Sequence, residues 1–354
     1  MNKSGENRGR VRLADVAALA GVSLGSASRA LSSPEAVRAP TLAKVRAAAD
    51  KLGYVPDLAA RALASGRSGT LGLLAPTLAN PIYAAFVQAA QRAADARGLQ
   101  LLTTSDEYDR VRGLEHARRL VERGVDGVIL IGADYDAQVF AALERRRTPH
   151  VFAWSYDEAR GRGCVGVSNA RAVWGVVRHL TDLGHRRFAV LSGDPRHNER
   201  ARSRLDGVRA ALATSGIGLP DEAVVICPFS IHAGREGMAR VMSMEPRPTA
   251  VICGTDLLAA GALAEAAARG ITVPDELSVT GFDDVDYAGL LTPPLTTVRV
   301  PAAEMGARAV EALLEAIETG RTPPDTELPA DLVLRGSTGP APRGRAGAAS
   351  GRDE

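Results

Sequence analysis

The sequence VRLADVAALAGVSLGSASRALSS at residues 11–33 decides the fold of the first part of the chain. Its first half places apolar residues on one helical face, at Leu13, Val16, Ala17 and Ala20. Gly21 can end that helix in the left-handed conformation, and Ser23 can cap a second helix over residues 24–31. A third helix is expected from about residue 40 to residue 52. Two short helices joined by a tight turn predict a helix-turn-helix, whose second helix fits the major groove of DNA.

The outward face of the second predicted helix favours contact with DNA. Ala27, Ala30 and Leu31 can face the interior, which leaves a mostly small and polar outer face. The outward residues are Leu24, Gly25, Ser26, Ser28 and Arg29. A purely structural three-helix bundle is the alternative, but small side chains suit a surface that must approach a groove closely.

The distribution of charge indicates an anionic partner at this end of the chain. Residues 1–67 hold eleven Lys or Arg and five Asp or Glu, a net charge of +6, while the rest of the chain has a net charge of −4. Nucleic acid is the simplest partner for a small basic domain. From charge alone, a solvated basic arm that binds nothing is the alternative.

Residues 11–33, followed by LGYVPDLAARAL at residues 52–63, resemble the N-terminus of the LacI/GalR family of repressors. The resemblance implies a sequence-specific DNA-binding regulator, in particular a repressor of carbohydrate-utilisation genes. It places Leu24 and Gly25 at the base-reading positions of the family, and Ser26, Ser28 and Arg29 at positions that contact phosphates and bases. Gly25 offers no side chain and Leu24 can contact only a thymine methyl group, so the operator of a relative cannot be transferred to this chain.

The segment from Pro56 to Gly69 is interpreted as a hinge. It is rich in alanine and favours helix, but it is short and has little core to pack against, so we expect it to fold only on binding. In the LacI/GalR family two such helices of a dimer pair in the minor groove, and a leucine from each opens the central base step. The resemblance gives this wedge role to Leu63 and places Ala60 at the DNA as well. An ordinary linker is the alternative.

From Thr70 onward, short apolar runs alternate with longer amphipathic stretches. Runs such as TLGLLAP, VDGVILIG and RRFAVLSG lack polar alternation, which predicts parallel strands covered on both faces. Helical patterns such as residues 205–215 and 257–269 lie between them, and a break falls near residues 168–169. We therefore predict a small all-α helix-turn-helix head and an α/β core of two doubly wound parallel-sheet lobes.

The core resembles the LacI/GalR family as well, for example in GFDDVDYAGLLTPPLTTVRVP at residues 281–301, and the whole match covers about residues 11–337. It implies the fold of periplasmic sugar-binding proteins, in which the chain crosses three times between two lobes. The implied ranges are 70–168 with 299–328 for lobe one, and 169–298 with 329–337 for lobe two.

Ligands of open α/β sheets bind beyond the carboxyl ends of the strands. The polar residues that close predicted strands are Asn80, Ser105, Ser168, Asn169, Thr255, Asp256 and Asp283. The resemblance implies that Arg204 and Asp283 grip a small-molecule effector, and it puts Thr255 where the family often has Asn. The residues implied to stack on the effector or to wall its pocket are Tyr83, Trp154 and Phe229.

An arginine and a carboxylate between aromatic faces suit a sugar, because the charged groups bridge paired hydroxyls and the rings cover the C–H face. A nucleobase or nucleoside stacked on Trp154 is the alternative ligand. For Asp283 alone, a turn cap after a strand explains the residue equally well. The expected effector is a sugar or sugar derivative held between the lobes.

Other classes of protein find little support. No apolar run approaches the ~20 residues that span a bilayer, and no signal-type stretch follows the basic N-terminus, so we expect a cytoplasmic protein. Three distant cysteines and six histidines show no metal-ligand spacing. No phosphate-binding glycine loop or G-x-S-x-G motif occurs, so we expect no cofactor, no metal and no enzyme activity. A solute-binding receptor would fit the lobes but not the basic head.

We divide the chain into a disordered arm at 1–10, the head at 11–56, the hinge at 57–69, the core at 70–337 and a disordered tail at 338–354. The tail is rich in Gly and Ala and has no leucine heptad, the feature that makes some relatives tetramers. We therefore expect a homodimer on a pseudo-palindromic operator. Effector binding would shift it between two states, with either induction or co-repression as the result.

Overall fold

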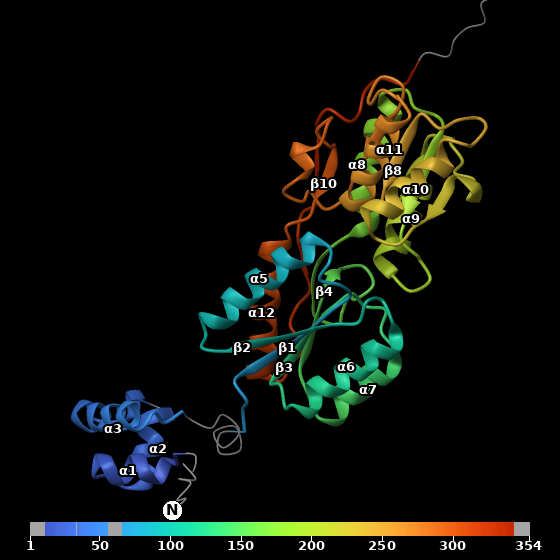
Figure 1. The fold of residues 1–354 in the computed structure, drawn as a ribbon. Coiled ribbons are helices and arrows are strands. Elements are labelled where there is room, and N and C mark those ends of the chain that lie inside the picture. Colours follow the sequence, from blue (N-terminus) through green and yellow to red (C-terminus); the bar gives the residue numbers. More distant parts are fainter. Residues whose placement is uncertain (1–10, 33, 56–65, 343–354) are drawn as a thin grey trace, which may run out of the picture. The chain divides into compact units, whose positions relative to one another are not determined.

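A computed structural model describes residues 11–32, 34–55 and 66–342, and Figure 1 shows it as a ribbon. The chain divides between Gly69 and Thr70 into two compact units, a helical head and an α/β core. The two predicted hinge contacts, Ala60 and Leu63, lie outside the described residues. The hinge helix therefore stays a prediction.

The head is a bundle of three helices around a small apolar centre. They are α1 (Leu13–Ala20), α2 (Leu24–Ser32) and α3 (Ala39–Leu52), with a 3-10 turn at Pro34–Ala36. Val16, Ala27 and Val45 fill the centre and are inaccessible to solvent. Gly21 ends α1 with φ +64°, a conformation that glycine adopts at least cost. The predicted helix-turn-helix is confirmed.

Lobe one of the core is a six-stranded parallel sheet with helices on both faces. Its strands, in spatial order, are β11 (Thr326–Glu327), β5 (Cys164–Val167), β4 (His150–Ser155), β3 (Gly127–Ile131), β1 (Thr70–Ala75) and β2 (Gln100–Ser105). Its helices are α5 (Pro81–Asp95), α6 (Arg110–Glu122), α7 (Ala137–Arg145) and α12 (Ala302–Thr319). Helices α5 and α12 pack together on one face, and α6 and α7 on the other (Figure 1).

Lobe two is a four-stranded parallel sheet built in the same way. Its strands, in spatial order, are β7 (Val224–Ile226), β6 (Phe188–Ser192), β8 (Ala250–Cys253) and β9 (Ser278–Thr280). Its helices are α8 (Asn169–Asp182), α9 (Glu199–Thr214), α10 (Ile231–Val241) and α11 (Asp256–Ala268), with 3-10 turns at Asp221–Ala223 and Ala288–Leu290. A separate antiparallel pair, β10 (Thr297–Arg299) and β12 (Asp331–Val333), lies beside α8.

Each lobe combines segments that lie far apart in the sequence. After β10 the chain returns to lobe one, where α12 packs on α5 and β11 pairs with β5. It then goes back to lobe two, where β12 pairs with β10. With the first passage after β5, the chain passes between the lobes three times. This is the α/β core with parallel sheets that the sequence predicted.

Buried apolar side chains form one cluster in the head and two in the core. The smaller core cluster includes Leu74, Leu130 and Phe152 and belongs to lobe one, whereas the larger one draws on both lobes. Among the described residues, no helix combines the length and the apolar character needed to cross a membrane.

The prediction of a disordered tail from residue 338 is wrong for its first residues. The Thr338 hydroxyl lies 3.0 Å from His179 Nε2, and the Ala341 N–H donates to the Leu183 carbonyl at 2.8 Å. His185, which is fully buried, places Nε2 3.0 Å from the Gly339 carbonyl oxygen. A buried imidazole needs such partners, which is why this stretch is held on lobe two. Residues 343–354 lie outside the described part of the chain.

Candidate DNA interface and effector site

Helix α2 turns the residues predicted to contact DNA toward solvent. The exposed members are Leu24, Gly25, Ser28 and Arg29. Ser26 is half-buried, because its hydroxyl lies 2.9 Å from the hydroxyl of Ser23 and its N–H donates to the same oxygen. Ala27 and Ala30 are buried in the head. This orientation agrees with the outward face deduced from the sequence.

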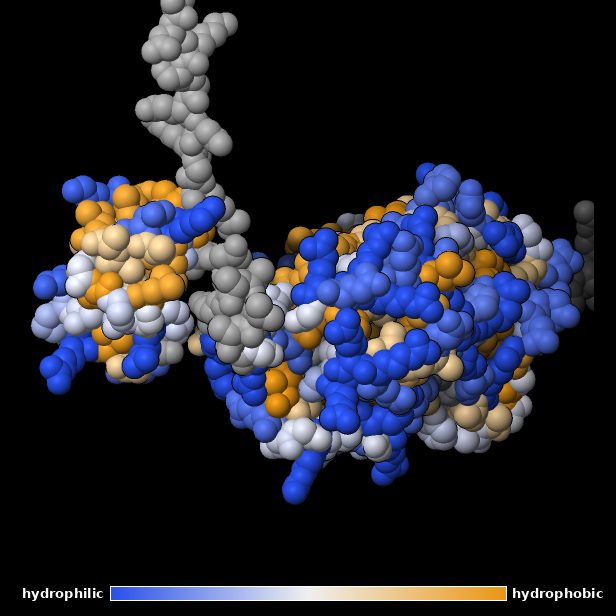
Figure 2. Space-filling model, turned by 90° about the horizontal axis from the view of Figure 1, so that it is seen from below, coloured by the Kyte–Doolittle hydropathy of each residue, from blue (hydrophilic) through white to orange (hydrophobic). Residues whose placement is uncertain are grey.

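Gly25 leaves the surface of α2 open to a close approach. A Cβ atom at this position would meet no heavy atom within 4 Å, so packing inside the head does not require glycine. On the side drawn in Figure 2, the head exposes broad hydrophobic surface bordered by hydrophilic side chains. Such a surface can place Ser28 and Arg29 at phosphates while Leu24 contacts a base methyl group.

Two predicted effector residues meet across the cleft between the lobes. Asn80 caps α5, since its Oδ1 accepts from the Ile82 N–H at 3.2 Å. The Nδ2 of Asn80 donates to Asp283 Oδ2, also at 3.2 Å. Asn80 belongs to lobe one and Asp283 to lobe two, and both are buried. This hydrogen bond therefore holds the two lobes in contact.

Aromatic rings cover each other on the lobe-one side of the cleft. The ring centroids of Tyr83 and Trp154 lie 4.9 Å apart, and Phe86 lies 5.0 Å from Trp154 on another side. Trp154 has φ +78°, which is rare outside glycine and is typical of functional sites. Its side chain is nevertheless only 2% exposed. Stacking on an effector would require these rings to separate.

Arg204 lies on α9 and points into the same region. Its Nη1 donates to Asn169 Oδ1 at 2.6 Å, and its guanidinium carbon lies 4.6 Å from the centre of the Phe282 ring. Asn169 in turn donates from Nδ2 to the Trp154 carbonyl at 3.2 Å. Burial lowers the pKa of Arg204, because removal from water disfavours the charged form. Asn169 thus links the predicted arginine to the predicted tryptophan.

Two acids sit behind this cluster in lobe two. Asp283 has φ +121°, which is strained for any residue other than glycine. Asp256 accepts from the Thr297 hydroxyl at 2.6 Å and from the Val285 N–H at 2.9 Å. Burial raises the pKa of both carboxyls, and mutual repulsion raises that of Asp283 further. The pair therefore holds a proton more readily than isolated carboxyls do.

Three predicted effector residues do not join the cluster through any contact recorded here. The Ser105 hydroxyl at the end of β2 is buried without a hydrogen-bond partner among the described residues. Thr255 caps α11 by accepting from the Leu258 N–H at 3.4 Å. Phe229 instead pairs with Tyr108 at a centroid distance of 5.4 Å.

The open space of the cleft lies beside the predicted cluster. A cavity of about 520 Å³ is bounded by both lobes, which is large enough for a small ligand. Its lining residues are Thr77, Glu107, Tyr108, Asp194, His197, Asn198, Ile226, Cys227, Pro228 and Phe229. Of the predicted residues only Phe229 belongs to this lining. Arg204 borders a cavity of about 20 Å³, which has room for one water molecule at most.

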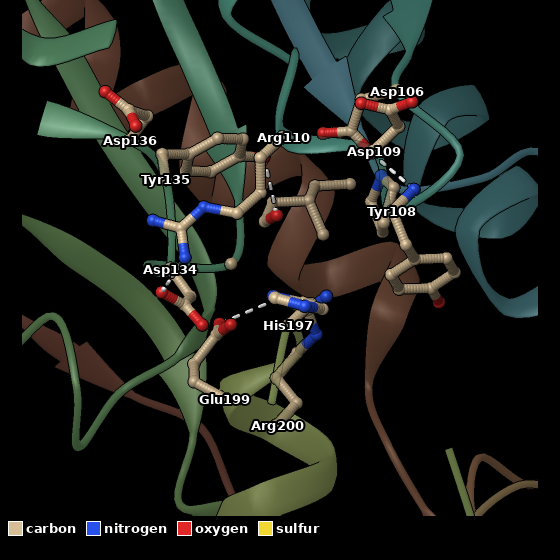
Figure 3. Close-up of a pocket in the computed structure, with 13 residues that line it drawn as sticks. Asp106, Tyr108, Asp109, Arg110, Asp134, Tyr135, Asp136, His197, Glu199 and Arg200 are labelled. Carbon is tan, nitrogen blue, oxygen red and sulfur yellow. Dashed lines mark hydrogen bonds and ion pairs between the residues drawn. The ribbon is translucent and has the colours of Figure 1, made fainter. Parts of the chain in front are cut away.

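The sequence gave no indication of the buried ion pair at the start of α9. Glu199 and Arg200 are 3% and 4% exposed, and Arg200 Nη1 lies 2.8 Å from Glu199 Oε1. The same oxygen accepts from the Ala133 N–H at 2.8 Å and from the Ser155 hydroxyl at 2.5 Å, both in lobe one. Figure 3 shows the pair in a narrow pocket that Tyr135 and other lobe-one residues also line.

Charge and shape both fix this ion pair in place. Burial alone would raise the pKa of Glu199, but Arg200 and the hydrogen bonds outweigh burial, and the pKa falls below its ordinary value. Gly132 makes room for the arginine, because a Cβ there would lie 1.9 Å from Arg200 Nη1. Lobe two therefore inserts a charged residue pair into lobe one.

Comparisons with known proteins cover both units. The family described as bacterial regulatory proteins, lacI family, matches residues 12–57, and the periplasmic binding protein-like domain matches residues 177–338. An uncharacterized HTH-type transcriptional regulator in the aml 5' region of Streptomyces limosus is 37% identical, over 92% of this chain and 94% of that protein. The ribose operon repressor of Escherichia coli K12 is 32% identical, over 86% and 92%. The lac repressor dimer bound to operator and the anti-inducer ONPF aligns with TM-score 0.82 and 28% identity, over 93% and 99%.

Proposed function

Because this chain belongs to the LacI family of bacterial regulatory proteins and is a DNA-binding transcriptional repressor, we propose that a small polar effector, bound between the lobes of the core, controls its hold on an operator. Repressors of this family are regulators and not enzymes. We further propose that the chain acts as a homodimer in the cytoplasm, where two heads read the halves of a pseudo-palindromic site.

The observation that carries the effector proposal is the contact of polar groups from both lobes. Asn80 meets Asp283, and Glu199 meets Ala133 and Ser155. A ligand in the cleft would exchange such contacts for its own and would change the angle between the lobes. Since a ligand shifts a two-state equilibrium only by its differential affinity, the cleft is where an effector has most leverage.

A sugar or sugar derivative is the effector that this chemistry supports best. The 520 Å³ cavity combines the aromatic rings of Tyr108 and Phe229 with the polar side chains of His197 and Asn198. Flat rings beside hydrogen-bonding groups suit the alternating C–H and O–H surface of a sugar. A relative is named for the ribose operon, which agrees with this choice. A nucleobase or nucleoside against the same two rings is the second candidate.

The direct experiment is a gel shift with genomic fragments, with and without candidate sugars and nucleosides. A sugar that changes the affinity for one fragment would support the proposal. Binding of a specific fragment that no small molecule alters, although the ligands tested bind the core, would contradict control through the cleft.

We predict that Arg29→Ala weakens operator binding about tenfold or more, because each subunit loses a contact of α2 with a phosphate or base. For a dimer, the slope of log affinity against log salt should fall by about two if both contacts are to phosphates. Fluorescence anisotropy of a labelled operator measures both effects. The control is Arg92→Ala on α5, which removes the same charge from the exposed surface of the core. Unchanged affinity at matched salt would contradict the assignment of α2.

The hinge proposal follows from the family and from position. Leu63 and Ala60 would reach the minor groove when two hinges pair at the centre of the operator. A pyrimidine–purine step there would deform most easily around a leucine wedge.

We predict that Asp283→Ala abolishes the response of operator affinity to the effector, because the strained, buried carboxyl that meets Asn80 is lost. The measurement is operator affinity over an effector titration. Asp286→Ala, an exposed acid three residues away, serves as the matched control and should respond normally. A full response of the Asp283 variant would remove this residue from the site.

A further inference from the structure

Arg204 is a buried cation without an anionic partner in the described part of the chain. Its Nε is enclosed and forms no hydrogen bond, and its Nη1 bonds to the neutral amide of Asn169. No described carboxylate reaches ion-pairing distance of its guanidinium, whereas Arg200, one turn earlier on the same helix, has Glu199 at 2.8 Å. A buried charge normally has a partner, because its isolation from water is costly.

The acids nearest to Arg204 are engaged elsewhere. Asp283 accepts from Asn80, and both oxygens of Asp256 accept hydrogen bonds, from Thr297 and Val285. Burial raises the pKa of both carboxyls, so these acids give up their protons less readily than exposed ones. The interior of lobe two therefore provides Arg204 with less negative charge than its formal composition implies.

The surroundings of Arg204 keep its donors available for a ligand. The guanidinium plane rests on the Phe282 ring at 4.6 Å, which holds the charge in place without using its N–H groups. Tyr108, which lines the 520 Å³ cavity, lies close enough for its charge to influence that of Arg204. The planar fork of an arginine matches the two oxygens of a carboxylate or phosphate.

We propose that the effector carries an anionic group, a carboxylate or a phosphate, and that this group pairs with Arg204 while the rest of the ligand occupies the cleft. The inference rests on the proposed function, since it names the chemical class of the molecule that the cleft binds. It separates sugar acids and phosphorylated sugars from neutral sugars.

Inorganic phosphate is the first probe, because it contains the charged group alone. In thermal unfolding of the full chain at constant ionic strength, phosphate in place of chloride should raise the midpoint of the wild type by a few degrees. The shift should vanish in Arg204→Met and return in part in Arg204→Lys. Arg202→Met, an exposed arginine on the same helix, is the control and should keep the shift. An equal shift in wild type and Arg204→Met, or no shift in either, would overturn the proposal.

The unliganded variants supply an independent readout. Because Arg204→Met removes a charge that lacks a partner, its unfolding midpoint without phosphate should equal or exceed that of the wild type. A midpoint many degrees lower would show that the protein already compensates this charge, and would overturn the proposal.

A matched set of ligands then distinguishes the sources of the anion and separates this proposal from the proposed function. Glucose, gluconate and glucose 6-phosphate share one carbon skeleton and differ in charge. Binding of gluconate or of the phosphate ester, lost in Arg204→Met, would support the anionic class and identify its source. Operator release by a neutral sugar that phosphate does not compete with would overturn the anionic class while leaving control by an effector intact.

Discussion

Replacing Glu199 with alanine should lower the free energy of unfolding of the core by about 3–5 kcal/mol, because it leaves the Arg200 guanidinium buried and unpaired. The same change removes the acceptor for the Ala133 N–H and the Ser155 hydroxyl across the cleft. Urea denaturation followed by circular dichroism measures the loss. No other ion pair recorded between described side chains has both partners this deeply buried.

Two further variants separate the charge of Glu199 from its other contacts. Glu199→Gln keeps an oxygen for Ala133 and Ser155 but not the charge, so its loss should be smaller. The double variant Glu199→Met/Arg200→Met removes both charges and should recover much of the stability. A double variant less stable than Glu199→Ala would contradict the unpaired-charge explanation.

Acid should reveal the same ion pair. The pKa of Glu199 is lower in the folded chain than its ordinary value, so its contribution is present above the unfolded pKa and disappears as pH falls through the folded pKa. The difference in stability between wild type and Glu199→Gln should therefore shrink toward low pH.

Gly261→Val should destabilise lobe two by about 3 kcal/mol, because α10 and α11 touch at their backbones. A Cβ at residue 261 would lie 2.1 Å from the Ile231 carbonyl oxygen and 2.7 Å from the Arg235 nitrogen. Neither backbone atom can move without shifting the whole helix. Helix propensity alone would favour valine over glycine slightly, so a loss of stability isolates the steric effect.

Ala264→Val is the matched control, since residue 264 lies on the exposed side of α11. It should change stability by a few tenths of a kcal/mol at most, as surface changes usually do. Thermal unfolding compares the two variants. If Gly261→Val were as stable as Ala264→Val, the close approach of the two helices would be refuted.

The sequence was sufficient to predict elements whose residues obey a local rule. The apolar spacing before Gly21 located α1 and its turn, and apolar runs without alternation located the parallel strands. The start of α9 could not be predicted in this way. The apolar pattern indicated a helix from residue 205, but α9 begins at Glu199, because charged residues there are buried against lobe one instead of solvent.

The candidate site shows the same division. Strand ends identified Asn80 and Asp283, which do meet, because parallel strands bring their carboxyl ends to one edge. Whether a residue borders open space depends on how far the lobes close, and no local pattern encodes that distance. Tyr108 and His197 line the larger cavity for this reason, although nothing in their own sequence neighbourhood marked them.

The interleaving of the two lobes has a consequence for synthesis on the ribosome. Lobe one lacks its edge strand β11 and the helix that packs on α5 until about residue 327 has been made. Lobe two lacks β12 and the segment that partners His185 until about residue 339. Only the head is contiguous, so it can become compact while translation continues. The clamp that would govern it must form almost entirely after the last codons have been read.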